Sequence, residues 1–222
     1  IALGILAASG QIDRDALAGC EFLGELGLTG ELRAVDGVLP AVLAATRDGR
    51  RLVVPAGSGA EAALARDAEA YVARTLLETC AGLGGTTALP RAQGGKEPAA
   101  APASAPDMAD VRGQAQARRA LEIAAAGGHH LLMSGPPGCG KTLLASRLPG
   151  LLPEASEAEA LETAAVASIS GRGFDPRRWR QRPWRAPHRG ASAAALAGGG
   201  SPPGPGEISR ALTYVGDEGQ VV

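Results

Sequence analysis

The chain has 222 residues, of which 45% are hydrophobic and 20% charged, a composition typical of a soluble globular protein with one large domain or two small ones. Its formal net charge of −1 excludes a global attraction to nucleic acid or membrane, so contact with a polyanion requires a local basic patch. Three cysteines without zinc-ligand spacing, and a first apolar run too short to span a bilayer, predict a cytoplasmic protein with no membrane partner.

The first 85 residues predict a small α/β domain, because short strand-like runs alternate with helical ones. Residues 1–8 are expected to form a buried helix or strand. Further strands are predicted at 31–35, 51–55 and 70–72, and helices at 38–45, 60–66 and 75–83. Since the first residue is Ile rather than Met, we expect the N-terminus of this domain to be incomplete.

Residues 86–106 predict an interdomain linker, because they are rich in Pro, Ala and Gly and lack apolar periodicity. Residues 107–222 are expected to form the second domain. Within it, Ser156 and Glu159 have the spacing of a capping box at a helix start. The predicted elements are a helix at 114–126 closed by Gly127 and Gly128, a strand at 130–133, helices at 141–148 and 160–169, and a loop at 198–206.

The sequence GPPGCGKT at residues 135–142 matches the phosphate-loop pattern G-x-x-x-x-G-K-[ST]. Glycines allow backbone N–H groups to surround phosphate oxygens, the Lys reaches the β- and γ-phosphates, and the hydroxyl behind it ligates Mg²⁺. The predicted strand before the motif and the helix after it are the context that the motif requires. We therefore predict ATP and Mg²⁺ as cofactors, with Lys141 as a catalytic residue and Thr142 as the metal ligand. The nucleotide-binding residues are Gly135, Pro136, Pro137, Gly138, Cys139, Gly140, Lys141 and Thr142.

Residues 172–189 hold seven arginines against one acid, together with both tryptophans of the chain. Cations interleaved with aromatic rings are typical of sites that bind single-stranded nucleic acid. The candidate DNA-binding residues are Arg180, Arg182, Trp184 and Arg185. The alternative is an insertion whose arginines pair with acids of a neighbouring subunit and whose tryptophans pack locally.

Four blocks, at residues 21–45, 110–153, 180–200 and 205–209, resemble in order the ComM/YifB family of magnesium-chelatase-like AAA+ ATPases. The resemblance implies an α/β fold: a small domain similar to the C-terminal domain of Lon protease at residues 1–85, followed by a partial P-loop AAA+ domain. Members of this family look like ring-forming, ATP-driven DNA motors that act in branch migration during natural transformation. The resemblance thus implies self-association, a DNA partner, and residues 110–114 beside the adenine.

The resemblance fails after residue 209, where the family continues through an apolar strand into an Asp-Glu pair that holds Mg²⁺ through water. This chain reads RALTYVGDEGQVV instead. Asp217 and Glu218 are candidates for a displaced catalytic pair, although Gly216 fits poorly in a central strand. The alternative that we favour is a truncated or frameshifted chain, which would bind ATP without hydrolysing it.

Two other functions compete with the DNA motor. A magnesium chelatase motor subunit would use the same ATPase to insert metal into a porphyrin, but such subunits resemble this chain only from the AAA+ module onward. A non-catalytic remnant would bind nucleotide weakly or fail to fold, because half of an AAA+ core leaves sheet edges uncovered.

Overall fold

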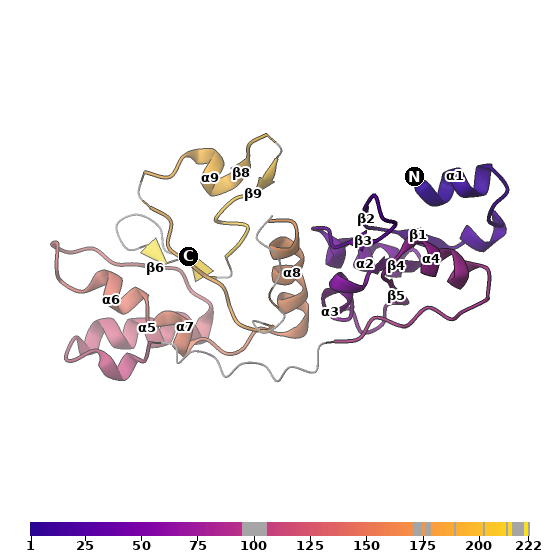
Figure 1. The fold of residues 1–222 in the computed structure, drawn as a ribbon. Helices are drawn as coiled ribbons and strands as arrows, with labels where there is room; N and C mark the ends of the chain where they lie inside the picture. The colour runs from indigo at the N-terminus through magenta and orange to yellow at the C-terminus, as the bar shows by residue number, and fades with distance from the viewer. Residues whose placement is uncertain are drawn as a thin grey trace. The chain divides into compact units, whose positions relative to one another are not determined.

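The computed structural model describes residues 1–94, 106–170, 175, 179–188, 190–201, 203–211, 213–214 and 220–221. Two compact units are present (Figure 1), one formed mainly by residues before the linker and one mainly by residues after it. The chain is of mixed α/β class, as the sequence predicted, and its three-stranded sheet is parallel. The likeness of the first unit to Lon stays a prediction.

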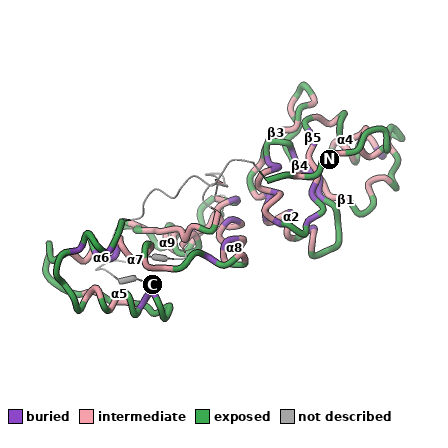
Figure 2. Tube along the Cα trace, turned by 90° about the horizontal axis from the view of Figure 1, so that it is seen from below, coloured by how far each residue is buried: buried purple, intermediate pink, exposed green. Residues whose placement is uncertain are grey.

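The first unit is built on a three-stranded parallel sheet in the order β1-β4-β5. Its strands are β1 (Cys20–Phe22), β4 (Arg51–Pro55) and β5 (Ala70–Ala73). Leu52, Val53 and Val54 are all buried, because a central strand covered on both faces needs a continuous apolar run. Figure 2 shows this buried region along β4 and the neighbouring α2 (Val38–Arg47). The strands predicted at 51–55 and 70–72 are therefore confirmed.

The remaining elements of the first unit are short and lie around this sheet. The first helix is exposed, whereas the sequence predicted burial: only Ala7 is buried, and Ile5 is 63% exposed. A surface helix buries a single stripe, so an apolar run around its whole circumference leaves large side chains in water. The elements are α1 (Ala2–Ala8), η1 (Asp15–Leu17), the antiparallel pair β2 (Glu25–Leu26) and β3 (Leu32–Arg33), η2 (Ala56–Ser58), α3 (Gly59–Ala62) and α4 (Leu76–Leu83).

The start of the predicted linker lies on the first unit. Val72 N–H donates to the carbonyl of Pro90 at 2.9 Å, and Ala92 N–H donates to the carbonyl of Ala70 at 2.8 Å. The side chain of Arg91 also donates to the carbonyl of Ala68, at 3.0 Å. These bonds cover the free edge of β5, which explains why a Pro- and Gly-rich stretch is ordered at this point.

The second unit has a core that joins helix α5 (Ala115–Gly127) to the segments on either side of it. Before α5 lies η3 (Met108–Asp110), and after it lie β6 (Leu131–Leu132), α6 (Lys141–Ala145) and α7 (Leu148–Leu151). The helix predicted at 114–126 is confirmed, and Gly128 ends it in the left-handed conformation with φ 62°. Its core residues are Met108, Val111, Leu121, Ala125, Leu144, Ala145 and Leu148.

The helix predicted at 141–148 is divided into two pieces. Pro149 has no N–H, and its ring would clash with the carbonyl of Ala145 four residues earlier, so α6 ends there and α7 begins at Leu148. The strand before α6 pairs antiparallel with β11 (Gln220–Val221). The phosphate-loop motif therefore lies between a short strand and a five-residue helix.

The rest of the second unit contains one longer helix and several short pairings. Helix α8 (Glu157–Ser168) begins with the predicted capping box, in which Ser156 and Glu159 each accept from the other's backbone N–H. The glycine tract predicted as a loop contains an antiparallel pair, β8 (Gly198–Gly199) with β9 (Gly204–Pro205). A Cβ at Gly198 would meet backbone atoms of this pair. The remaining elements are β7 (Trp184–Arg185), α9 (Ala193–Ala197) and β10 (Thr213–Tyr214), with β7 and β10 paired in parallel.

Candidate functional site

The phosphate-loop motif forms an exposed turn between β6 and α6. Gly138 and Gly140 have φ values of 81° and 91°, a left-handed conformation that a side chain disfavours. At Gly135 a Cβ would lie 3.0 Å from Sγ of Cys139, so a larger residue there would push the two arms of the turn apart. The glycine positions thus follow from the backbone geometry and leave the turn open to a ligand.

Lys141 folds its ammonium group back into this turn. Nζ donates to the carbonyl of Gly135 at 2.7 Å and to that of Pro136 at 3.1 Å. It also lies 3.7 Å from Sγ of Cys139, while Thr142 is exposed on the first turn of α6. A cation inside a glycine turn, with a free hydroxyl next to it, fits a phosphate with bound Mg²⁺. The residues present therefore fit both predicted cofactors.

The segment that the resemblance places beside the adenine also contacts this turn. Gln114 precedes α5, and its Nε2 donates to the carbonyl of Cys139 at 3.2 Å. In the same region Arg147 forms an ion pair with Asp110, at 3.4 Å between Nη2 and Oδ2. Neither contact could be read from the sequence, because the partners are 25 and 37 residues apart and no local pattern pairs them.

A cavity of about 330 Å³ lies beside the phosphate loop. Its walls come from the first two turns of α5, from β6 and from the loop, and they include Gln114, Ala117, Ala120, Met133, Cys139 and Lys141. The small alanine side chains leave the space, and polar groups stand at its edge. A flat, mostly apolar group attached to a phosphate chain fits such a site.

Two ion pairs join the described part of the arginine segment to acids of the same chain. Arg182 binds both carboxylate oxygens of Glu159, at 3.2 and 3.1 Å, and donates to the carbonyl of Pro153 at 2.8 Å. Arg185 binds both oxygens of Glu207, at 2.6 and 2.5 Å. These two-point pairs fix geometry as well as charge. The sequence analysis offered the alternative that these arginines pair with acids rather than with DNA. Arg182 and Arg185 do pair with acids, but the acids belong to the same chain and not to a neighbouring subunit.

The other two candidate DNA-binding residues differ from each other. Trp184 is half-buried and packs against the core of the second unit, so part of its ring serves the fold. Arg180 is exposed and has a left-handed backbone, with φ 66°. Among the described residues its side chain has no recorded partner, which leaves it available to an external anion.

Several predicted residues lie outside the described part of the chain. They are the candidate acidic pair Asp217 and Glu218 together with Arg172, Phe174, Arg177, Arg178 and Arg189. The structure therefore brings Gln114 and a cavity next to the phosphate loop. Arg182 and Arg185, in contrast, do not form a common site, because each pairs with a different acid.

Glu159 combines the helix cap with one of these ion pairs, and its pKa lies below the ordinary value. The causes are hydrogen bonds from the backbone and side chain of Ser156 and then from Arg182. Because the folded form holds the carboxylate ionised, this stabilisation is complete above the unfolded pKa of about 4.3. It disappears as the pH falls through the lower pKa of the folded form.

Substitution of Glu159 with Gln is therefore expected to destabilise the second unit at neutral pH and to matter less in acid. Urea unfolding followed by tryptophan fluorescence measures this unit, since both tryptophans belong to it. The difference in unfolding free energy between the parent chain and the variant should be constant above about pH 5 and shrink below pH 4. A difference that persisted at pH 3 would show that Glu159 does not act through its charge.

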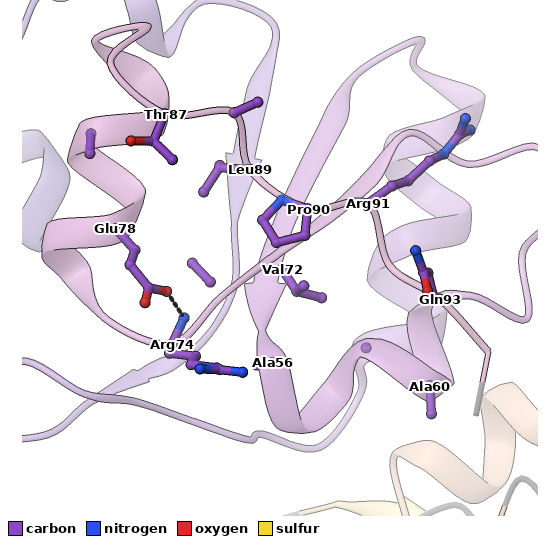
Figure 3. Close-up of a pocket in the computed structure, with 14 residues that line it drawn as sticks. Ala56, Ala60, Val72, Arg74, Glu78, Thr87, Leu89, Pro90, Arg91 and Gln93 are labelled. Carbon is purple, nitrogen blue, oxygen red and sulfur yellow. Dashed lines mark hydrogen bonds between the residues drawn. The ribbon is translucent and has the colours of Figure 1, made fainter. Parts of the chain in front are cut away.

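A second cavity lies entirely within the first unit (Figure 3) and measures about 780 Å³. Small apolar residues of η2, α3 and β5 line it, together with residues 87–91. Of its polar groups, Glu78 of α4 accepts from the backbone N–H of Arg74 at 2.7 Å, so this carboxylate holds the segment that precedes the helix. The cavity contains no residue of the phosphate-loop motif, and we place the candidate site at residues 135–142.

No helix in the described ranges has the length and apolarity needed to cross a bilayer.

The family described as "Magnesium chelatase, subunit ChlI" matches residues 107–215. The family described as "Subunit ChlI of Mg-chelatase" matches residues 1–58. The two matches thus fall before and after the predicted linker.

Curated relatives align with nearly the whole chain. The competence protein ComM of Haemophilus influenzae is 50% identical over 97% of this chain and 43% of its own length. YifB of Salmonella typhimurium is 47% identical over 95% of this chain and 41% of its own length. YifB of Escherichia coli is 46% identical over the same shares. The chain thus spans about two fifths of the length of these relatives.

Proposed function

The chain belongs to the magnesium chelatase ChlI family, and on this basis we propose that its second unit binds ATP with Mg²⁺ through residues 135–142. The observation that carries the proposal is the ammonium group of Lys141, held inside the glycine turn by two backbone carbonyls. These contacts are weak enough to exchange for phosphate oxygens, which are stronger partners for a cation. Thr142 would then supply its hydroxyl to Mg²⁺, and the metal would neutralise charge on the phosphates.

The adenine would occupy the cavity formed by α5, β6 and the loop. Its alanine-lined wall suits a flat ring, and the segment that carries Gln114 closes one edge. The expectation that residues 110–114 lie beside the base is consistent with this position. The base would thus lie on the side of the loop where α5 begins.

Titration of Mg·ATP into this chain by isothermal calorimetry tests the proposal. We expect one site per chain with a dissociation constant of about 1–100 μM, within the range of ordinary nucleotide sites, and competition by ADP. Absence of heat and of competition up to millimolar nucleotide would refute it.

We further propose that the intact function is that of a ComM-type, ring-forming DNA motor. The relative named as a competence protein aligns with 97% of this chain and thus with both units. The part before the linker does not separate this function from that of a chelatase motor subunit, because the model described as "Subunit ChlI of Mg-chelatase" matches residues 1–58. The proposal therefore rests on the alignment with the competence protein. Catalysis by Asp217 and Glu218 remains a prediction.

For DNA contact we propose Arg180 as the arginine that meets the phosphate backbone. Arg182 and Arg185 already hold carboxylates within the chain, and replacing either of them would break an ion pair of the fold. The exposed side chain of Arg180 has no such role among the described residues. Its substitution therefore changes the surface charge without breaking an ion pair of the fold.

Substitution of Arg180 with Ala is expected to weaken binding to a single-stranded oligonucleotide by about 2–5-fold and to reduce the salt slope by about 0.7, the value for one phosphate contact. Fluorescence anisotropy at several salt concentrations measures both quantities. Arg47→Ala is the matched control, because it removes the same charge from an exposed side chain that, like Arg180, has no ion-pair partner among the described residues. Equal losses in the two variants would mean that only net charge matters and that Arg180 makes no specific contact.

A further inference from the structure

Gln114 has a backbone conformation that its residue type disfavours. Its φ and ψ are 53° and 41°, in the left-handed region where residues other than Gly, Asn and Asp are uncommon. Gly113 directly before it is also left-handed, with φ 69°. The main chain thus makes a sharp left-handed turn at the start of α5. Such a conformation persists only where neighbouring contacts hold it, and it is frequent at functional sites.

The contact that holds Gln114 is the phosphate loop itself. Its Nε2 donates to the carbonyl of Cys139 at 3.2 Å. The same atom would lie 3.0 Å from a Cβ at Gly140, so the glycine is what allows the amide to approach the loop this closely. The side chain is exposed, and its strained turn serves no buried packing.

The bond fixes the orientation of one peptide group in the loop. In a trans peptide the carbonyl and the following N–H point in opposite directions. With the Cys139 carbonyl directed at Gln114, the N–H of Gly140 is directed to the opposite side. A peptide of the loop is thereby held in one of its two possible orientations.

A second tether joins the same two parts of the chain. Arg147, which lies between α6 and α7, forms an ion pair with Asp110 of η3, and its side chain is only 16% exposed. One contact therefore joins η3 to the start of α7, and the other joins the residue before α5 to the loop. Together they join the segment at residues 108–114 to the residues on both sides of α6, with the side chain of Gln114 held against the loop.

We propose that Gln114 is a positioning residue that pre-orients the phosphate loop for the phosphate chain of the nucleotide. The inference rests on the proposed function, since it assigns a role within the same site. Gln114 also lines the cavity proposed for the base, but the role proposed here acts through the Cys139–Gly140 peptide. Loss of the Gln114 side chain should therefore weaken the binding of a phosphate chain that has no base attached.

The test compares Gln114→Asn with the parent chain, using Mg·ATP and inorganic triphosphate as separate probes in calorimetry. Asn tolerates the left-handed backbone better than Gln does, but it is one methylene too short to reach the loop. Affinity for both probes should fall by the same factor, about 3–10-fold, as expected for one lost hydrogen bond. The thermal midpoint of the unliganded chain should stay the same or rise, which separates positioning from a structural role.

Gln114→Glu is the second variant, because it keeps the length of the side chain but its carboxylate cannot donate to a carbonyl. Its affinity for both probes should fall at least as far. Parent-like binding of triphosphate by either variant, or a loss confined to ATP, would overturn the proposal. Lys141→Ala serves as the reference: if it bound both probes as tightly as the parent, or if the parent bound neither, the proposed function itself would fail.

Discussion

Substitution of Lys141 with Ala is expected to weaken Mg·ATP binding by about 100-fold or more, because charge-assisted hydrogen bonds to phosphate contribute roughly 1.5–3 kcal/mol each. The ammonium group is already placed inside the turn, within 2.7–3.1 Å of two carbonyl oxygens. It therefore needs only to exchange partners when a nucleotide binds. Calorimetric titration against the parent chain measures the change.

The unliganded Lys141→Ala variant should keep the stability of the parent. The two carbonyls that lose the ammonium group belong to the exposed residues Gly135 and Pro136, so water can replace it at little cost. Lys141→Met is a matched variant that keeps the apolar stem and removes only the charge. If Met at this position bound Mg·ATP like the parent chain, the assignment of residues 135–142 as a phosphate site would be wrong.

Substitution of Leu121 with Ala is expected to lower the free energy of unfolding of the second unit by about 2–5 kcal/mol. Leu121 is fully buried at the centre of the cluster that joins α5 to α6 and α7. Its loss leaves a cavity beside Leu144 and Leu148, which anchor the helix after the phosphate loop. Urea unfolding monitored by tryptophan fluorescence measures the change.

Ile123→Ala provides the control for this variant, because it lies on the same helix and is 51% exposed. Its expected effect is below about 0.5 kcal/mol. A bound nucleotide should restore part of the stability of the Leu121→Ala chain in a concentration-dependent way. Equal losses at the two positions would show that helix α5 is not held by the proposed core.

Part of the fold could be predicted because its signals are local. The apolar run at residues 52–54 predicted the central strand, and Ser156 with Glu159 predicted the start of α8. Gly128 marked the end of α5 in the same way. Each of these signals works through neighbours within four residues, so a single sequence contains all the information needed.

Two sequence predictions were wrong because they concerned properties that depend on the surroundings of a segment, namely its burial and its pairing with a strand. The apolar run at residues 1–8 is helical, but whether it is buried depends on what packs against it, and only Ala7 is covered. Residues 90–92 looked like linker, yet they pair with β5 because that strand offers a free edge. Composition does not encode which edge is free.

The candidate site divides along the same line. The sequence by itself identified the phosphate-loop motif, because its glycines, Lys141 and Thr142 are adjacent along the chain; their binding of phosphate stays a prediction. Only the tertiary structure decided the roles of Gln114, Arg182 and Arg185, since their partners lie 22 to 25 residues away. The sequence shows which side chains can form an ion pair or a hydrogen bond. Which partner each of them meets depends on the fold, because the fold brings residues that are distant along the chain within hydrogen-bonding distance.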